Sequence, residues 1–341
     1  MTELTTTIIK VVKSKMFALI VLLAILTTVM QIGTDGLFLH PINIRTILDM
    51  MIITGMLTIG SAMLLIAGAL DLSMGTVGTM AGMLFAVLLR NYGVHWSLAF
   101  IICLGLASVF GIINAVLVNY AKFPAFIATL AMASVAEGVS FFFAGGANIS
   151  LSDPFMRALA TGRFLNNTIP FSIIILLVFF IVYGVILAKT KFGRQIYLVG
   201  GNPQASRLVG INPRRISFIL FINSSILGAI AGIMFNSRVA AATTLGITDR
   251  QFFGLIAAIL GGVSFGGGTG GLGGAFVGLL IFSAFNNGMF LLGVDSFWNQ
   301  AIFGMLLLVS LTFDYLGSVG GKNIMRRIKG RFAGMKSDAV T

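Results

Sequence analysis

The chain has 341 residues, of which 57% are hydrophobic and only 9% are charged. This is too little polar surface for a soluble globular protein of that length, so we expect lipid to be its solvent. The formal charge of +12 does not indicate a nucleic-acid partner, because such proteins combine basic patches with aromatic residues on a soluble scaffold. The single cysteine, Cys103, excludes an intrachain disulfide framework and a cysteine cluster for metal.

Apolar runs long enough to cross a bilayer, roughly 20 residues each, recur from Met16 to Leu316. The first run follows Lys10, Lys13 and Lys15 as in a secretory signal, but no small-residue cleavage pattern comes after it, so we expect a retained span. The pattern predicts an all-α polytopic membrane protein with about ten transmembrane helices. Their expected ranges are 16–33, 46–67, 72–89, 96–118, 124–144, 168–188, 216–236, 251–266, 272–292 and 297–316.

The basic residues predict the orientation of these spans. If both termini are cytoplasmic, most of the 22 lysines and arginines fall on the cytoplasmic side, as is usual in membrane proteins. The cytoplasmic parts are then segment 1–15, a loop at 189–215 and a basic tail at 317–341, around a transmembrane domain at 16–316. The longest external loop, about 145–167, either receives a partner or is an ordinary solvated loop.

Two stretches inside the apolar region, 68–75 and 261–274, are rich in glycine and small polar residues, and both are expected to interrupt helices. Irregular backbone at membrane depth is tolerated only where protein or a water-filled cavity covers it, and transporter pathways use such breaks. Gly266, Gly268 and Gly271 have dinucleotide-binding spacing, but no strand precedes them, so tight turning and close packing are favoured. Two further pairs predict close helix contacts: Gly228 with Gly232, and Gly274 with Gly278.

Polar groups on or beside the spans are the candidates for a solute pathway. Asp71 lies at the first break, where we favour helix capping over solute contact. For Glu137, deeper in its span, solute contact and a structural role stay equally open. Uncharged side chains suit a neutral polyhydroxylated solute, although each can instead bond a neighbouring helix. The pathway candidates are Asp71, Asn114, Glu137, Asn223, Asn286 and Asn287.

The loop at 189–215 carries helix-cap chemistry as well as charge. Asn202 is a favourable helix cap, Pro203 fits a first helical turn, and Gly210 suits the residue beyond a helix end. These residues predict a short helix over about 203–209. Because so short a helix is unstable alone in water, we expect packing on the spans or on a partner to support it.

The stretch TKFGRQIYLVGGNPQASRLVGI at 190–211 resembles the cytoplasmic coupling loop of ribose-type ABC importer permeases, within the branched-chain amino acid and ribose permease family. Other blocks agree in family order: DLSMG at 71–75, AFIATL at 125–130, IAAILGGVS at 256–264 and NNG at 286–288. The resemblance covers about residues 45–315. It implies the ABC importer permease fold in a bacterial inner membrane, a second permease copy or a related permease, a cytoplasmic ATP-binding subunit, and an external sugar-binding protein.

By this resemblance, the residues expected to couple the chain to the ATPase are Gly193, Arg194, Gly200, Gly201, Asn202, Ala205 and Gly210. Sugar-transporting members commonly carry an acidic residue before the block at 256–264. Here Gln251 to Gly254 occupy that region, so the resemblance does not identify the sugar.

The expected function is import of a ribose-like monosaccharide, without a cofactor on this chain. No G-x-x-x-x-G-K-[ST] phosphate loop is present, so ATP hydrolysis is expected on a separate subunit. The alternative is an ion-coupled secondary transporter that uses a carboxylate such as Glu137 or Asp71. An intramembrane enzyme is disfavoured, because the spans hold no histidine and no plausible lysine base.

Overall fold

The structure is a computed structural model that describes residues 15–151, 153–164 and 169–317. The basic N-terminal segment and the basic tail expected from the charge pattern therefore lie almost wholly outside the described residues. The helices are α2 (Lys15–Gly33), α3 (Pro41–Ile66), α4 (Met74–Tyr92), α5 (Trp96–Asn119), α6 (Ala125–Ala144), α7 (Pro154–Thr161), α8 (Phe171–Lys189), α9 (Lys191–Gly201), α10 (Pro203–Leu208), α11 (Pro213–Val239), α12 (Gln251–Leu260), α13 (Leu272–Leu291) and α14 (Ser296–Gly317).

Four two-residue strands form two small antiparallel pairs. β1 (Ile149–Ser150) pairs with β4 (Ala241–Ala242), and β2 (Arg163–Phe164) pairs with β3 (Ile169–Pro170). Between them, Asp153 caps α7 by accepting a hydrogen bond from the Met156 amide at 2.8 Å. The loop expected at 145–167 is therefore partly ordered by pairing and capping, rather than being wholly irregular.

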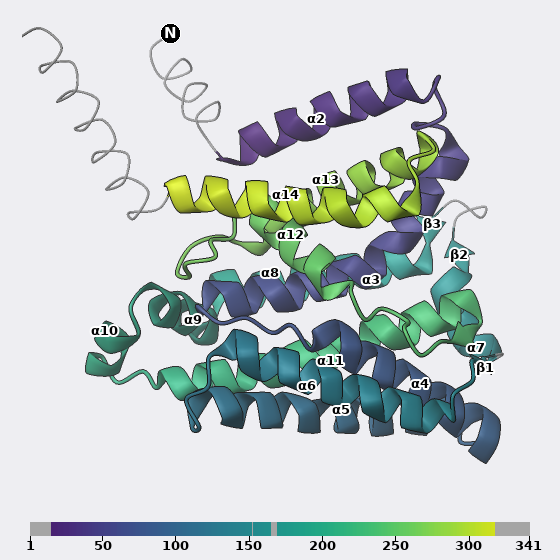
Figure 1. Cartoon of the computed structure of the whole chain (residues 1–341). Helices are drawn as coiled ribbons and strands as arrows, with labels where there is room; N and C mark the ends of the chain where they lie inside the picture. The colour runs from purple at the N-terminus through teal and green to yellow at the C-terminus, as the bar shows by residue number, and fades with distance from the viewer. Residues whose placement is uncertain (1–14, 152, 165–168, 318–341) are drawn as a thin grey trace, which may run out of the picture.

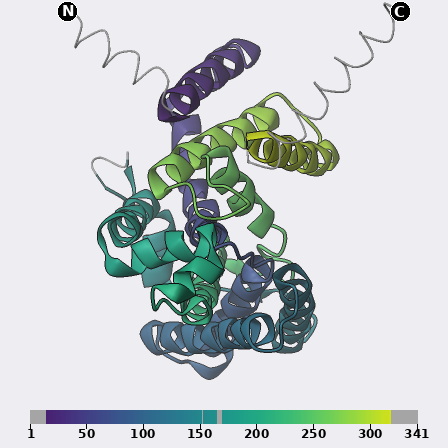
Figure 2. The same cartoon turned by 90° about the vertical axis from the view of Figure 1, so that its left-hand side faces the viewer.

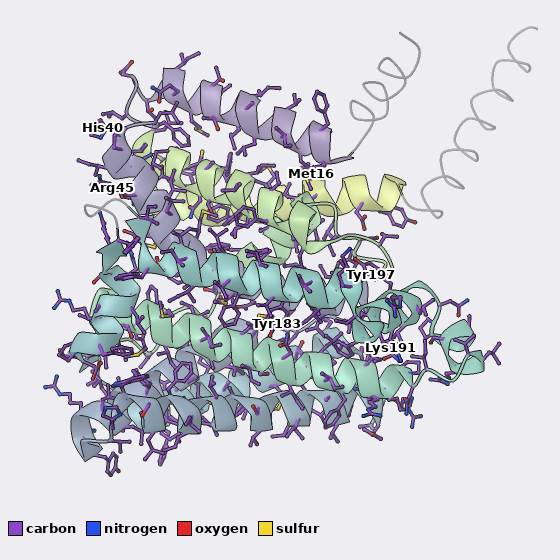
Figure 3. All side chains as sticks on the ribbon, turned by 180° about the vertical axis from the view of Figure 1, so that it is seen from behind. Met16, His40, Arg45, Tyr183, Lys191 and Tyr197 are labelled. Carbon is purple, nitrogen blue, oxygen red and sulfur yellow. The ribbon has the colours of Figure 1, made fainter. Side chains whose placement is uncertain are left out.

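The long helices run between two ends of the molecule (Figure 1). α9 and α10 lie at one end, and α7 with the short strands lies at the other. Figure 3 places Met16, Lys191 and Tyr197 near the α9–α10 end, and His40 and Arg45 at the opposite end. With a cytoplasmic N-terminus, the expected spans 16–33 and 46–67 place residues 34–45, which include His40 and Arg45, outside. The loop expected on the cytoplasmic side and these two residues lie at opposite ends of the bundle.

Seven of the described helices are long and apolar enough to cross a membrane: α2, α3, α5, α6, α8, α11 and α13. α12 is a shorter apolar helix, and within α14 the apolar stretch is Ala301–Thr312. The all-α membrane fold is confirmed, whereas the count of ten spans stays a prediction. The span expected at 251–266 was too long, because α12 ends at Leu260 where the glycine-rich stretch begins.

Helices α3 and α11 form the centre of the bundle. Every α3 residue from Met51 to Ile66 is buried, and α3 packs against α8, α11, α12 and α13. α11 packs in addition against α4 and α5. In Figure 2, α3 lies between α2, α13 and α14 on one side and α5 and α6 on the other. The outer helices expose many large apolar side chains, which suits contact with lipid rather than water.

Both predicted glycine pairs make close helix contacts. A Cβ on Gly228 or Gly232 of α11 would collide with the backbone carbonyl of Met74 or Gly78 on α4. Gly274 and Gly278 of α13 pack in the same way against the end of α12. Small residues therefore let these helix backbones approach directly, as the spacing predicted.

Candidate functional site

Both glycine-rich stretches interrupt helices as predicted. The first break, residues 67–73, separates α3 from α4, and the second break, residues 261–271, separates α12 from α13. The second break follows a helix rather than a strand, which is not the context of a dinucleotide-binding motif. Of the three spaced glycines, Gly268 has a φ of 73° and packs closely against Gly201, whereas a Cβ on Gly266 or Gly271 would meet no atom closer than 3.6 Å. Asp314 of α14 holds this break by accepting hydrogen bonds from the Ser264 hydroxyl at 3.1 Å and the Phe265 amide at 2.9 Å.

Asp71 is the acceptor of a buried hydrogen-bond network in the first break. Its carboxylate accepts from the Ser73 amide at 2.8 Å, the Ser73 hydroxyl at 2.6 Å and the Ser224 hydroxyl at 2.5 Å. Asn114 of α5 donates in turn to the Ser73 hydroxyl at 2.8 Å. We call Asp71, Ser73, Asn114 and Ser224 the Asp71 network. It joins the first break to α5 and α11.

The expectation that Asp71 caps α4 is therefore corrected. The residue that flanks α4 is Ser73, whose side chain makes no cap hydrogen bond, and Asp71 instead forms a turn with Ser73 and reaches across to α11. Sequence reasoning missed Ser73 and Ser224. The Asp-x-Ser spacing signals a local turn, but nothing in the sequence signals a partner 153 residues away.

The remaining pathway candidates lie in separate places. Asn223 of α11 accepts a hydrogen bond from the Tyr183 hydroxyl of α8, and Asn287 of α13 accepts one from Asn43 of α3 at 2.8 Å. The half-buried candidates Glu137 on α6 and Asn286 on α13 have no hydrogen-bond partner in the part of the chain that the structure describes. The structure brings Asp71 and Asn114 together but does not gather all six candidates into one site.

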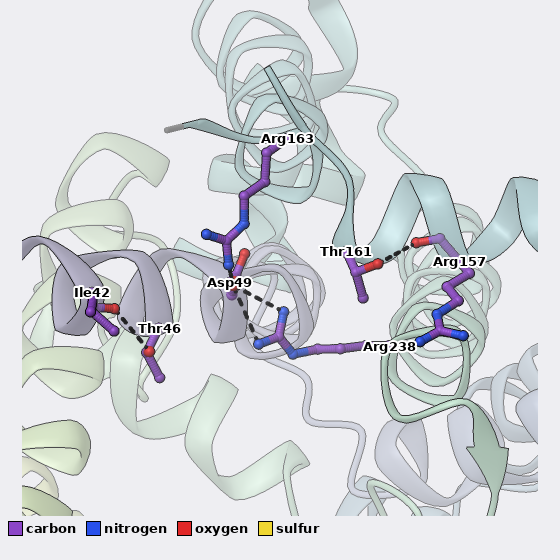
Figure 4. Close-up of polar contacts among 7 residues, drawn as sticks. All are labelled: Ile42, Thr46, Asp49, Arg157, Thr161, Arg163 and Arg238. Atoms are coloured by element: carbon purple, nitrogen blue, oxygen red, sulfur yellow. Dashed lines mark hydrogen bonds and ion pairs between the residues drawn. The ribbon is translucent and has the colours of Figure 1, made fainter. Parts of the chain in front are cut away.

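An ion cluster that sequence reasoning missed lies toward the α7 end (Figure 4). Asp49 of α3 forms ion pairs with Arg163 of β2 at 3.1 Å and with Arg238 of α11 at 3.4 Å. The Asp49 side chain is 5% exposed, and those of Arg163 and Arg238 are 25% and 18% exposed. The arginines are 114 and 189 residues from Asp49, so no local pattern could have predicted the cluster.

The predicted short helix at 203–209 is present as α10. The Asn202 side chain caps it by accepting from the Gln204 amide at 3.0 Å and the Ala205 amide at 2.9 Å. Pro203 begins the helix, and Gly210, at a φ of 78°, adopts the left-handed backbone beyond its end. The three residues that predicted α10 act as expected.

A second helix in this loop, α9, was not predicted, and three glycines among its residues disfavour a helix. Packing overrides that preference: Gly193, Ile196 and Val199 are buried. Thr190 caps α9 by accepting from the Gly193 amide at 3.1 Å. This threonine and the apolar spacing of Ile196 and Val199 were the available signals.

The surface of α9 and α10 is both apolar and basic. Leu208 is 89% exposed and Val209 is 68% exposed, although both lie at an end of the molecule expected in water. Arg194 and Arg207 are exposed as well. We call these four residues the α9–α10 surface. Exposed apolar side chains rimmed by charge are typical of a protein-binding surface.

Comparison with known proteins identifies the family of the chain. The family described as branched-chain amino acid transport system / permease component matches residues 43–311. Ribose import permease protein RbsC of Bacillus subtilis is 32% identical over 81% of this chain and 86% of its own length. L-arabinose ABC transporter permease protein AraH of Azospirillum brasilense is 31% identical over 81% of both chains. Xylose transport system permease protein XylH of Haemophilus influenzae is 27% identical over 89% of this chain and 97% of its own length.

No solved structure matches the chain significantly. The family match spans both breaks, α9 and α10. It supports the expected importer permease and gives no support to the ion-coupled alternative. The chain is a membrane-embedded transport subunit rather than an enzyme, and it belongs to the family of branched-chain amino acid transport system permease components.

Proposed function

We propose that this chain is the transmembrane subunit of an ATP-driven importer that carries a ribose-like monosaccharide across a bacterial cytoplasmic membrane. The observation that carries the proposal is the α9–α10 pair, a capped and packed unit with exposed apolar and basic side chains. The solute class comes from the relatives, whose names specify ribose, arabinose and xylose, all of them pentoses.

The coupling residues divide into those that shape the loop and those that contact the ATP-binding subunit. Gly193 and Gly200 allow α9 to pack closely, while Asn202 and Gly210 define the ends of α10. Arg194 is exposed and free to contact the partner, together with the apolar residues of the α9–α10 surface. In this proposal the ATP-binding subunit covers that surface.

The α9–α10 end is cytoplasmic in this proposal. The described chain both begins and ends near that end, since the start of α2 and the end of α14 lie there in Figure 1. This arrangement supports cytoplasmic termini. The opposite end, with α7 and the short strands, then faces an external sugar-binding protein.

Solute contacts belong to the half-buried candidates rather than to the Asp71 network, because Asp71 and Asn114 are buried and hydrogen-bonded within the protein. Those candidates are Glu137, Asn223, Asn286 and Asn287. A second permease copy, or a related permease, completes the transporter beside them.

The proposal is tested by purifying the chain with the ATP-binding subunit encoded by a neighbouring gene. We expect Arg194→Glu and Leu208→Ser each to weaken the association by roughly tenfold, as loss of a central interface contact does. Arg157→Glu and Leu39→Ser are matched controls, because Arg157 is exposed on α7 and Leu39 is exposed next to His40, and both α7 and His40 lie at the opposite end of the molecule. Absence of association with the unmodified chain, or association unaffected by Arg194→Glu and Leu208→Ser, would count against the proposal.

A further inference from the structure

Glycines from three distant parts of the chain meet beside the end of α9. A Cβ on Gly267 of the second break would lie 2.8 Å from the Gly200 carbonyl oxygen and 3.1 Å from the Cα of Gly68 in the first break. A Cβ on Gly268 would lie 2.6 Å from the Cα of Gly201. We call these five residues the glycine junction. Backbone packs directly on backbone there, because side chains at Gly267 and Gly268 would not fit.

Hydrogen bonds hold the same contact. The Ile66 carbonyl, at the end of α3, accepts from the Gly268 amide at 2.8 Å, and a Cβ on Gly200 would collide with that carbonyl oxygen. The Tyr197 hydroxyl of α9 donates to the Gly270 carbonyl of the second break at 2.8 Å. The hydroxyl is protonated at neutral pH and so can donate, and burial raises the pKa of Tyr197 further above its ordinary value.

The junction connects the α9–α10 surface to both breaks through a short stretch of backbone. Asn202 alone separates α9 from α10, and it flanks both helices. A displacement of α10 therefore reaches the end of α9 within one residue. Contacts between backbones contain no flexible side chain that could absorb such a displacement, and close-packed regions transmit strain.

Beyond the junction, each break is tied to a different helix. The first break is hydrogen-bonded to α11 through Asp71 and Ser224. The second break is hydrogen-bonded to α14 through Ser264 and Asp314. The end of α9 thus lies where one movement can shift two helices on different sides of α3 (Figure 2).

We propose that the glycine junction is the mechanical link between the ATP-binding subunit and both breaks, with Gly200, Gly267 and Gly268 as positioning residues for coupled transport. The proposal rests on the proposed function, since a docked ATP-binding subunit supplies the movement. It extends the coupling role beyond the loop at 189–215 to the second break.

Two variants test the junction in complexes assembled from the full chain, its ATP-binding subunit and its sugar-binding protein. Gly267→Ala places a methyl group against Gly200 and Gly68. Tyr197→Phe removes the hydrogen bond to Gly270 but keeps the ring, so it preserves the packing of α9.

Two glycines of the same break serve as controls. A Cβ on Gly266 would have Ser264 Oγ as its nearest atom, at 3.6 Å, so Gly266→Ala fits without a collision. Gly262 has a φ of 84° and no atom within 4 Å of a Cβ, so Gly262→Ala reproduces the backbone strain of Gly267→Ala without the junction contact.

The measurement is the amount of sugar imported per ATP hydrolysed, normalised to the assembled complex. We expect this ratio to fall roughly fivefold in Gly267→Ala, a change typical of a coupling contact, and about threefold in Tyr197→Phe, in line with loss of one hydrogen bond. Both controls are expected to keep the unmodified ratio. A merely structural role would lower the yield of complex without changing the ratio.

An unchanged ratio in Tyr197→Phe and Gly267→Ala would overturn the junction while leaving the proposed function intact. An equal fall in Gly262→Ala and Gly267→Ala would also overturn it, because strain in the loop would then explain the effect. If the Gly267→Ala complex does not assemble, the ratio of sugar imported to ATP hydrolysed in Tyr197→Phe alone decides whether the junction couples transport. An unmodified complex that imports no sugar with ATP would instead contradict the proposed function.

Discussion

Asp71 carries three hydrogen bonds in a site with almost no access to solvent. A polar group at membrane depth is costly unless it is paired, so such a residue is either part of a pathway or part of the framework. Its donors come from its own turn and from α11, and they use both carboxylate oxygens. This favours the framework, with Asp71 fixing the first break against α11.

We expect Asp71→Ala to lower the free energy of unfolding by about 1–3 kcal/mol, because the amide and the hydroxyl of Ser73 lose their acceptor in a buried site. The Ser224 hydroxyl can still donate to the Phe221 carbonyl, at 2.9 Å. Thermal unfolding of the purified chain in detergent measures the effect. Asp71→Asn keeps one acceptor oxygen, so its unfolding temperature should lie between those of the unmodified chain and Asp71→Ala. Asp71→Asn with unchanged stability but no sugar uptake would instead indicate solute contact.

The ion cluster around Asp49 leads to a second prediction. Asp49→Asn leaves Arg163 and Arg238 facing each other without a counter-charge, and we expect a loss of stability of up to about 3–5 kcal/mol, reduced by the partial exposure of both arginines. Arg163→Gln should cost less, because Asp49 keeps Arg238. The same thermal unfolding assay compares them, and equal stability of Asp49→Asn and the unmodified chain would contradict this role.

Sequence reasoning at this scale identified residue types but not their partners. Asp71 and Asn114 were chosen as pathway candidates because polar groups on apolar spans are unusual, which is a local property. Their actual role depends on Ser224, 153 residues from Asp71 along the chain. Such a pairing exists only after the helices have packed.

Among the elements, α10 could be predicted and α9 could not. Asn202, Pro203 and Gly210 act on their immediate neighbours, so their chemistry is readable in the sequence. α9 depends on contacts with distant segments, such as the packing of Gly200 against the end of α3. The length expected for α12 was wrong for a local reason, because the helix ends where the glycine-rich stretch begins.

We expect Asn202→Ala to destabilise α10 by about 0.5–2 kcal/mol, because two backbone amides lose their acceptor. Amide hydrogen exchange over residues 204–209 should then accelerate, and association with the ATP-binding subunit should weaken. Asn202→Asp is the control, since it keeps the cap oxygen. Unchanged exchange in Asn202→Ala would show that tertiary packing alone holds α10.

At the scale of the whole molecule, composition and the continuous apolar runs were enough to predict an all-α membrane fold. So apolar a chain needs lipid, lipid requires internally paired backbone, and runs of roughly 20 apolar residues have the length of a membrane-spanning helix. The number of spans was not readable to the same degree. α3 is buried along most of its length, whereas α2 packs mainly against α13 and exposes apolar side chains. Both helices are apolar by hydropathy, although α3 contacts protein and the exposed side chains of α2 suit contact with lipid.

The separation of the two ends is what links fold to function. α9 and α10 provide the surface proposed for the ATP-binding subunit, and the glycine junction brings the end of α9 into contact with both breaks. Energy and solute are then handled in different parts of one chain. This division requires that transport depends on a separate ATP-hydrolysing protein.

Uptake into proteoliposomes tests that requirement most directly. The chain is reconstituted with its ATP-binding subunit and sugar-binding protein, and accumulation of labelled ribose, xylose or arabinose is followed with and without ATP on the side of the ATP-binding subunit. We expect accumulation of at least one of these sugars only when ATP and both partners are present. Accumulation by the chain alone, driven by an ion gradient and unaffected by ATP, would contradict the account.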